Sequence, residues 1–82
     1  MLIKDDSTMP IGWITLYKGK DIAVSINPVT ISRIERKYLD NNDSIAQITF
    51  VDGYNMLVEE TVVRVYYLIK VAQEDKIHKI KS

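Results

Sequence analysis

Apolar and polar residues alternate over much of the chain, which is the pattern of β-strands that bury one face. Residues 14–17, ITLY, alternate in this way, and residues 22–26 repeat the alternation with isoleucine and valine. The segment between them, residues 18–21, is predicted to be a turn in which Gly19 is free to take a positive φ. Together these segments predict a β-hairpin with one apolar face.

Three more strands are expected downstream, over residues 32–39, 46–50 and 54–59. Asn27-Pro28 ends the second strand, because proline lacks the backbone N–H that a ladder needs and favours extended geometry in the residue before it. The polar cluster over residues 40–44 and the Asp52-Gly53 pair are typical of turns between antiparallel strands. We therefore expect a five-stranded antiparallel β-meander, or a small and partly open barrel, over residues 13–59.

The segment TVVRVYYLIKVA, residues 61–72, fits a helix and a strand almost equally well by periodicity. In a helix, one arc of about 120° contains the apolar side chains of Val62, Val65, Leu68, Ile69 and Ala72. The segment is longer than the usual strand of about 5–6 residues. Thr61, which follows two glutamates, suits an N-cap near the positive end of a helix. We therefore predict an α+β fold in which a helix over residues 61–75 covers the sheet.

The helical interpretation leaves a second apolar line on the outside of the helix. Val63, Tyr67 and Val71 recur at every fourth position, with Tyr66 at the edge of the line. One explanation is that scattered apolar residues are normal on a protein surface. The other is an interface, because a helix that is apolar nearly all round is usually covered and tyrosine is enriched where proteins meet. We favour an interface with a second copy of the chain or with another protein.

The 82 residues fit one domain, with an irregular lead-in over residues 1–12 and a lysine-rich tail over residues 76–82. The chain has no cysteine and a single histidine, His78, so disulfides and thiolate metal sites are excluded. We expect no metal site and no cofactor. A chain this small without such crosslinks gains from oligomerisation, which lets a modest core use a partner's surface. A homo-oligomer is therefore expected.

Charge and hydropathy exclude further classes. The 11 basic and 11 acidic residues balance, whereas DNA-binding proteins show a basic excess or stripe, so we expect no DNA partner. No apolar run approaches the roughly 20 residues that cross a bilayer, and no signal peptide is visible, so we expect a cytoplasmic protein without a membrane span. Adjacent carboxylates such as Glu59-Glu60 point to opposite faces of a strand rather than into one cleft. We find no catalytic residues and expect no enzyme.

Trp13 and Tyr17 are the best candidates for contact with a small ligand. They share the face of the first strand that lies opposite its isoleucine and leucine, and an exposed aromatic strip can stack on a nucleobase. Lys18 and Lys20 flank the glycine of the adjoining turn, although a lone glycine between two lysines falls short of a phosphate-binding loop. A small nucleotide is the ligand that this group suits. The alternative is that a loop or a subunit covers the face.

The order of these features resembles the small flagellar FlbD family, which includes the swarming-motility protein SwrD. The resemblance covers about residues 14–69 and rests on Lys18-Gly19-Lys20, Asn27-Pro28 before Ile31, Asp52-Gly53, and the step from Val58 and Glu60 to Thr61. The lead-in, the excursion over residues 35–44 and the tail depart from the family pattern and fit a phage-encoded relative. The resemblance implies a non-enzymatic role through protein contacts and supplies no catalytic residues.

The sequence thus predicts a small non-catalytic protein-interaction module that self-associates, similar to the motility-associated FlbD-like proteins. One alternative is an inhibitor from a phage or mobile element that binds a host protein or holds a small nucleotide between subunits. The other alternative is an RNA-binding regulator built as a small β-rich dimer with a terminal helix.

Overall fold

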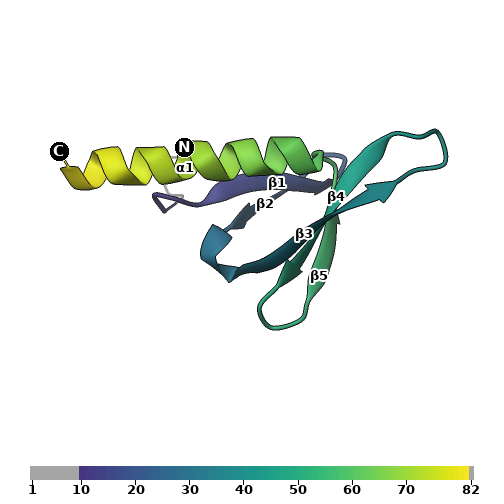
Figure 1. Ribbon diagram of the computed structural model, residues 1–82, viewed down its shortest axis with the longest axis horizontal. Helices are drawn as coiled ribbons and strands as arrows, with labels where there is room; N and C mark the ends of the chain where they lie inside the picture. The colour runs from purple at the N-terminus through teal and green to yellow at the C-terminus, as the bar shows by residue number, and fades with distance from the viewer. Residues whose placement is uncertain (1–9, 82) are drawn as a thin grey trace.

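The computed structural model describes residues 10–81 and the side chains of residues 10–75. Its strands and helix are, in chain order, β1 (Ile14–Gly19), β2 (Ile22–Ile26), β3 (Ile31–Tyr38), β4 (Ser44–Phe50), β5 (Asn55–Val58) and α1 (Val62–Lys81). A short 3-10 helix, η2 (Pro28–Thr30), separates β2 from β3. The predicted α+β class is confirmed, with the helix at the C-terminal end (Figure 1).

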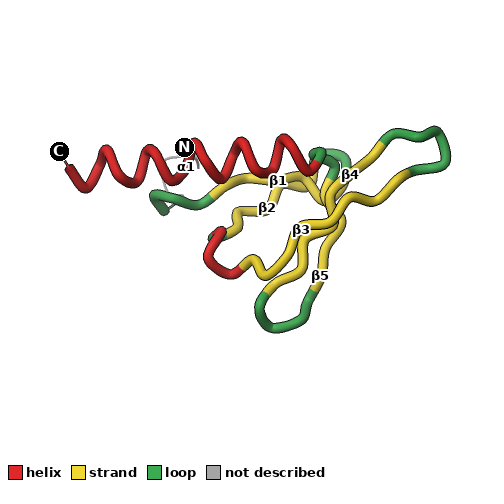
Figure 2. Tube along the Cα trace, viewed as in Figure 1, coloured by secondary structure: helices red, strands yellow, loops and turns green. Residues whose placement is uncertain are grey.

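The strands form two antiparallel sheets rather than one. β1 pairs with β2, and β3, β4 and β5 pair in that order. Asn27 explains the division, because its side-chain oxygen accepts the Val29 N–H at 3.3 Å and its carbonyl accepts the Thr30 N–H at 3.0 Å. These bonds turn the chain at η2, where Pro28 cannot donate to a ladder. β2 and β3 therefore separate, and the strands of the described residues form no closed barrel (Figure 2).

The expected turns on either side of β4 are present and are held by short polar side chains. Gly53 has a φ of 93°, and the Asp52 carboxylate accepts the Tyr54 N–H at 3.0 Å. In the turn before β4, the side-chain oxygen of Asn41 accepts the Asp43 N–H at 3.1 Å. The side chain of Asn41 in one turn and that of Asp52 in the other therefore accept a backbone N–H, as the composition of the two segments predicts.

The turn between β1 and β2 differs from the expectation. Gly19 pairs with Ile22 as the last residue of β1, and the positive φ, 66°, falls on Asp21. The two-residue loop is therefore Lys20-Asp21. Aspartate tolerates this left-handed backbone because its short side chain can hydrogen-bond locally. The predicted turn is present, but Gly19 does not take a positive φ.

Helix α1 packs its predicted apolar arc against both sheets. Val65 and Ala72 are buried, and the other three members of the arc pack against the buried core. The strands supply the rest of that core, which consists of Ile14, Leu16, Ile26, Ala46, Ile48 and Val58. The helical interpretation of the closing segment is confirmed. Valine and tyrosine are weak helix formers, but burying one face of the segment outweighs that propensity cost.

The N-terminal end of α1 agrees with the prediction from the sequence, and its C-terminal end does not. Thr61 caps the helix as predicted, since its hydroxyl oxygen accepts the Arg64 N–H at 3.1 Å and its carbonyl accepts the Val65 N–H at 2.9 Å. At the other end, α1 continues to Lys81 instead of ending at Asp75. Residues 62–81 contain no glycine or proline, so no residue there stops the helix. The segment expected to be a tail is therefore helical as far as residue 81.

The molecule is elongated, with extents of 45 × 30 × 24 Å. The β3–β4 hairpin projects at one end, and α1 extends past the strands at the other (Figure 1).

Candidate functional site

The predicted interface residues lie in three different environments around α1. Tyr66 flanks the buried arc on the side of β3, where it lines a groove between the strand and the helix. Val71 flanks the arc on the opposite side, where it lines a hollow with Trp13. Val63 and Tyr67 lie between these flanks, on the side of the helix away from the sheets. The structure therefore groups Val63, Tyr66 and Tyr67 and separates Val71 from them.

The outward side of α1 is apolar and exposed near its N-terminus. Val63 is 69% exposed and Tyr67 is 54% exposed, although each lies on a well-formed helix. The guanidinium of Arg64 lies 5.4 Å from the centre of the Tyr67 ring, within the range of a cation–π contact. The result is an aromatic and aliphatic patch of the kind that forms protein contacts.

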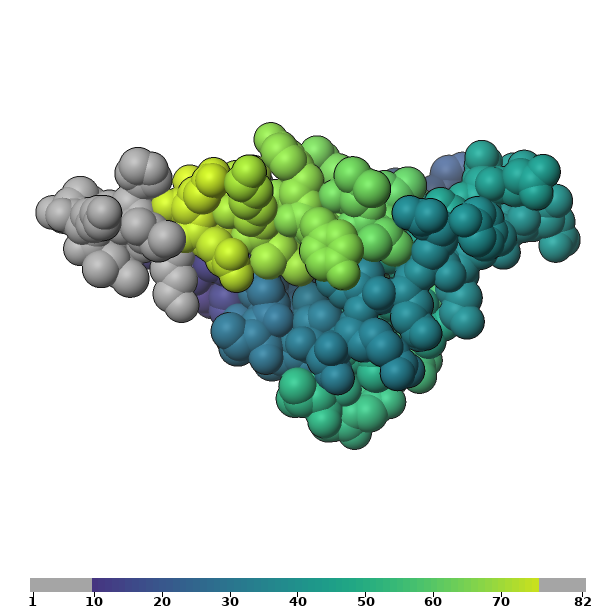
Figure 3. Space-filling view, in the orientation of Figure 1, coloured from purple at the N-terminus to yellow at the C-terminus, as the bar shows by residue number. Residues whose placement is uncertain are grey.

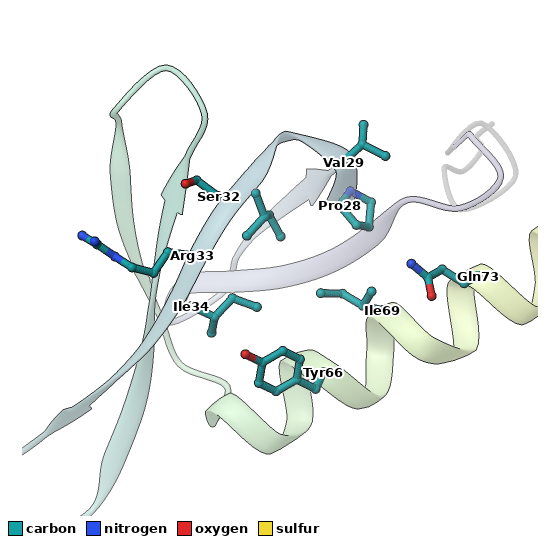
Figure 4. A pocket seen from close by; sticks show the side chains of 9 residues that line it. Pro28, Val29, Ser32, Arg33, Ile34, Tyr66, Ile69 and Gln73 are labelled. Atoms are coloured by element: carbon teal, nitrogen blue, oxygen red, sulfur yellow. The ribbon is translucent and has the colours of Figure 1, made fainter.

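A groove of about 290 Å³ lies between β3 and α1. Ile34 forms part of its β3 wall, and Tyr66 faces it from the helix (Figure 4). Ile69 and Gln73 continue the helix wall one and two turns further along. In the space-filling view the helix lies along β3 on one face of the molecule (Figure 3). Tyr66, which is 55% exposed, therefore connects the outward patch of α1 with the edge of the sheet.

Val71 belongs to a different surface. It is half-buried and lines a hollow of about 510 Å³ together with Leu68, Asp75 and Trp13. The segment before β1 passes beside Val71 and covers part of it. The four-residue spacing between Tyr67 and Val71 contains no information about this distant segment. The predicted line of three residues is thus exposed at two of them, Val63 and Tyr67.

Trp13 also borders an aromatic hollow that the sequence did not indicate. This hollow, of about 420 Å³, lies between β2 and the β4–β5 hairpin and includes Phe50, Tyr54 and Met56. The rings of Phe50 and Tyr54 stack with centres 6.0 Å apart and planes 25° apart. The two aromatic residues flank the Val51–Gly53 turn in the sequence, which is the signal that could have identified them. Aromatic residues from separate segments of the chain therefore gather on one side of the fold.

The proposed ligand-contact residues do not all come together. Tyr17 is exposed opposite the buried Ile14 and Leu16, as predicted. Trp13 lies before β1, whereas Lys18 and Lys20 are exposed at its far end. The strand rise places Trp13 about 17 Å from Lys18 along the strand. The two lysines therefore lie at the opposite end of β1 from the aromatic hollow.

The backbone of Tyr17 has a structural role that the sequence did not indicate. Its N–H donates to both carboxylate oxygens of Glu60, at 3.1 and 3.2 Å, and its carbonyl accepts the Glu59 N–H at 2.7 Å. The Glu60 carbonyl in turn accepts the Ala46 N–H at 2.9 Å. The segment before α1 thus links β1 of one sheet to β4 of the other, and the position of the helix depends on it.

Other site types have no support among residues 10–81. The structure places no group of three or more potential metal ligands together within these residues. None of the helices in the part of the chain that the structure describes is long and apolar enough to cross a bilayer. The side chain of His78 lies outside the described side chains.

Comparison of the chain with protein-family models, curated proteins and solved structures gives no match. The resemblance to the FlbD family therefore stays a prediction.

Proposed function

We propose that this protein is a small non-catalytic interaction module that self-associates through the outward side of α1 and the adjoining β3 flank. The observation that carries the proposal is the exposure of Val63, Tyr66 and Tyr67 on a helix whose opposite arc already completes the core. These three side chains contribute nothing to the buried core of the single chain. We therefore assign these side chains a role in contacts with another molecule.

The small core of the single chain also supports a partner. It has eight buried apolar residues among the described side chains. Covering the helix patch in a dimer would supply burial that this core lacks.

The outward patch is suited to a second copy because residues 62–70 of α1 contain no acidic side chain. Their two basic residues are Arg64, whose guanidinium lies over the Tyr67 ring, and Lys70, which is exposed. Two such patches can meet around a two-fold axis without a buried unpaired carboxylate. An isologous dimer then buries tyrosine rings at its centre, where they contribute most.

Replacing Val63 by lysine and Tyr67 by glutamate in one chain tests this function. Both side chains are exposed, so the variant should keep the helix content of the parent protein by circular dichroism. Light scattering should show particles of lower mass than the parent protein gives at the same concentration. A parent protein that is already monomeric would refute the proposal. So would a double variant that keeps the parent mass.

The aromatic hollow favours a second candidate function, the binding of a small planar ligand such as a nucleobase. Trp13, Phe50 and Tyr54 border the hollow, and stacking on aromatic rings is the usual way in which proteins hold bases. The chain has one tryptophan, Trp13, which borders both this hollow and the one beside Val71, so its fluorescence reports on that side of the fold. Titration with mononucleotides and short RNA at low salt should change that fluorescence, and binding should weaken with salt. No change with any of them would refute this candidate, including the RNA-binding alternative.

A further inference from the structure

β3 is an edge strand that lies open beside the proposed interface. It occupies the end of the order β3-β4-β5, and no strand of the described chain pairs with its other edge. The groove between β3 and α1 runs along this edge and is walled by Tyr66 and Ile69 on the helix side. An unpaired edge next to a hydrophobic groove is a template for the addition of another strand.

We propose that β3 pairs antiparallel with β3 of a second copy around a two-fold axis at Ile34, which joins two three-stranded sheets into one of six strands. This inference rests on the proposed self-association and specifies its geometry. A two-fold axis perpendicular to the sheet keeps each face of the two sheets on the same side after they join. Directly opposed residues of antiparallel strands point to the same face, so the residue at the axis lies opposite its own copy. The strand centre therefore offers Arg33, Ile34, Glu35 and Arg36 as candidate axis positions.

Charge selects Ile34 among these positions. With the axis at Ile34, Arg33 faces the partner's Glu35, and the same pair occurs again across the axis. With the axis at any of the other three residues, a charged side chain directly faces its own copy, which destabilises a strand pair. Only the Ile34 register therefore combines two pairs of opposite charge with no pair of like charge directly opposed.

The same register agrees with the surroundings of the strand. Arg33 and Glu35 alternate with Ile34 along β3, so their side chains project from the opposite face of the strand, as Figure 4 shows for Arg33. These side chains are 63% and 42% exposed, with Nε of Arg33 3.5 Å from Oε1 of Glu35. Each is therefore free to form a second ion pair. On the other face, Ile34 shares the groove with Tyr66, so a two-fold axis at Ile34 brings the two Tyr66 residues towards each other. The strand edge and Tyr66 then form one continuous interface.

Single cysteines in this cysteine-free chain test the register directly. Directly opposed residues of antiparallel strands have Cα atoms about 4.5–5.5 Å apart, which suits a disulfide. The I34C variant should therefore form a covalent dimer under mild oxidation. The matched variants E35C and R36C should stay largely monomeric on a non-reducing gel. Efficient crosslinking at either of those positions and not at Ile34 would overturn the register.

Charge exchange gives an independent test that leaves Ile34 intact. R33E and E35R should each weaken dimerisation by about tenfold or more, because each turns two attractive pairs into two repulsive ones. The double variant R33E/E35R restores both pairs and should dimerise like the parent protein. If R33E and E35R dimerise like the parent protein and I34C forms no covalent dimer, β3 pairing is refuted while the helix interface stands. A monomeric parent protein would refute both proposals.

Discussion

The backbone N–H of Tyr17 lies between the two carboxylate oxygens of Glu60, at 3.1 and 3.2 Å, although the residues are 43 positions apart. Through this contact, the residue that precedes the helix cap is tied to the first strand. The two sheets share no strand pairing, so this contact, the backbone hydrogen bonds of Glu59 and Glu60, and the core beneath α1 set their relative position. The helix patch and the β3 groove therefore depend on it.

Replacing Glu60 by alanine should destabilise the fold by about 1–2 kcal/mol, because the change leaves the Tyr17 N–H without its charged acceptor. Urea unfolding followed by circular dichroism measures the loss. Glu59→Ala serves as the matched control, since the Glu59 side chain is exposed and only its backbone N–H bonds to Tyr17. Equal losses in the two variants would contradict the role of the Glu60 carboxylate.

Leu16 and Leu57 offer a second matched pair, on β1 and β5. Leu16 is fully buried in the core, so Leu16→Ala should cost about 2–5 kcal/mol. Leu57 is 50% exposed, and Leu57→Ala should stay within about 0.5 kcal/mol of the parent protein. Thermal or urea unfolding of both variants checks the difference. If Leu57→Ala were the more damaging change, the assignment of the core face would be wrong.

Gly53 isolates the effect of backbone strain. Its φ is 93°, and an added Cβ would meet no atom within 4 Å, so Gly53→Ala should cost about 1–2 kcal/mol through backbone conformation alone. Gly19→Ala is the control, because Gly19 lies in β1 without a positive φ and its added Cβ would meet the Ile22 side chain at 3.4 Å. That variant should unfold at nearly the same urea concentration as the parent protein. A larger loss at Gly19 would contradict the turn geometry described above.

Local pattern predicted much of this fold because local physics controls those parts. The alternation around Ile14 and Leu16 places both side chains in the core, and the arc that includes Val65 and Ala72 faces inward. The cap at Thr61 follows from a hydroxyl placed before an apolar run. Each of these features depends on a few neighbouring residues.

The remaining features depend on contacts between distant segments. Spacing places Val71 in line with Tyr67, but the chain before β1 lies beside Val71 and half-buries it. Two glutamates before a helix suggest an interaction with its positive end, whereas the Glu60 carboxylate accepts the Tyr17 N–H instead. Periodicity along one segment contains no information about either neighbour. The division into two sheets is missed in the same way, because it follows from how η2 turns the chain.

Val63 and Val51 provide a matched pair for the surface that the proposal uses. They are 69% and 70% exposed, one on α1 and the other in the β4–β5 turn. Val63→Lys places a charge in the proposed interface and should raise the dissociation constant of the dimer by about tenfold or more. Val51→Lys should leave that constant unchanged. Sedimentation of both variants over a concentration series would show the contrast, and equal effects would exclude a specific helix interface.

The mass of the unmodified protein in solution tests self-association most directly. Light scattering coupled to size separation should give about 19 kDa, twice the 9.5 kDa of one chain, and the value should fall towards that of one chain on dilution. A mass of 9.5 kDa that does not change as the protein is concentrated into the millimolar range would contradict the account. In that case the apolar side of α1 would be ordinary exposed surface.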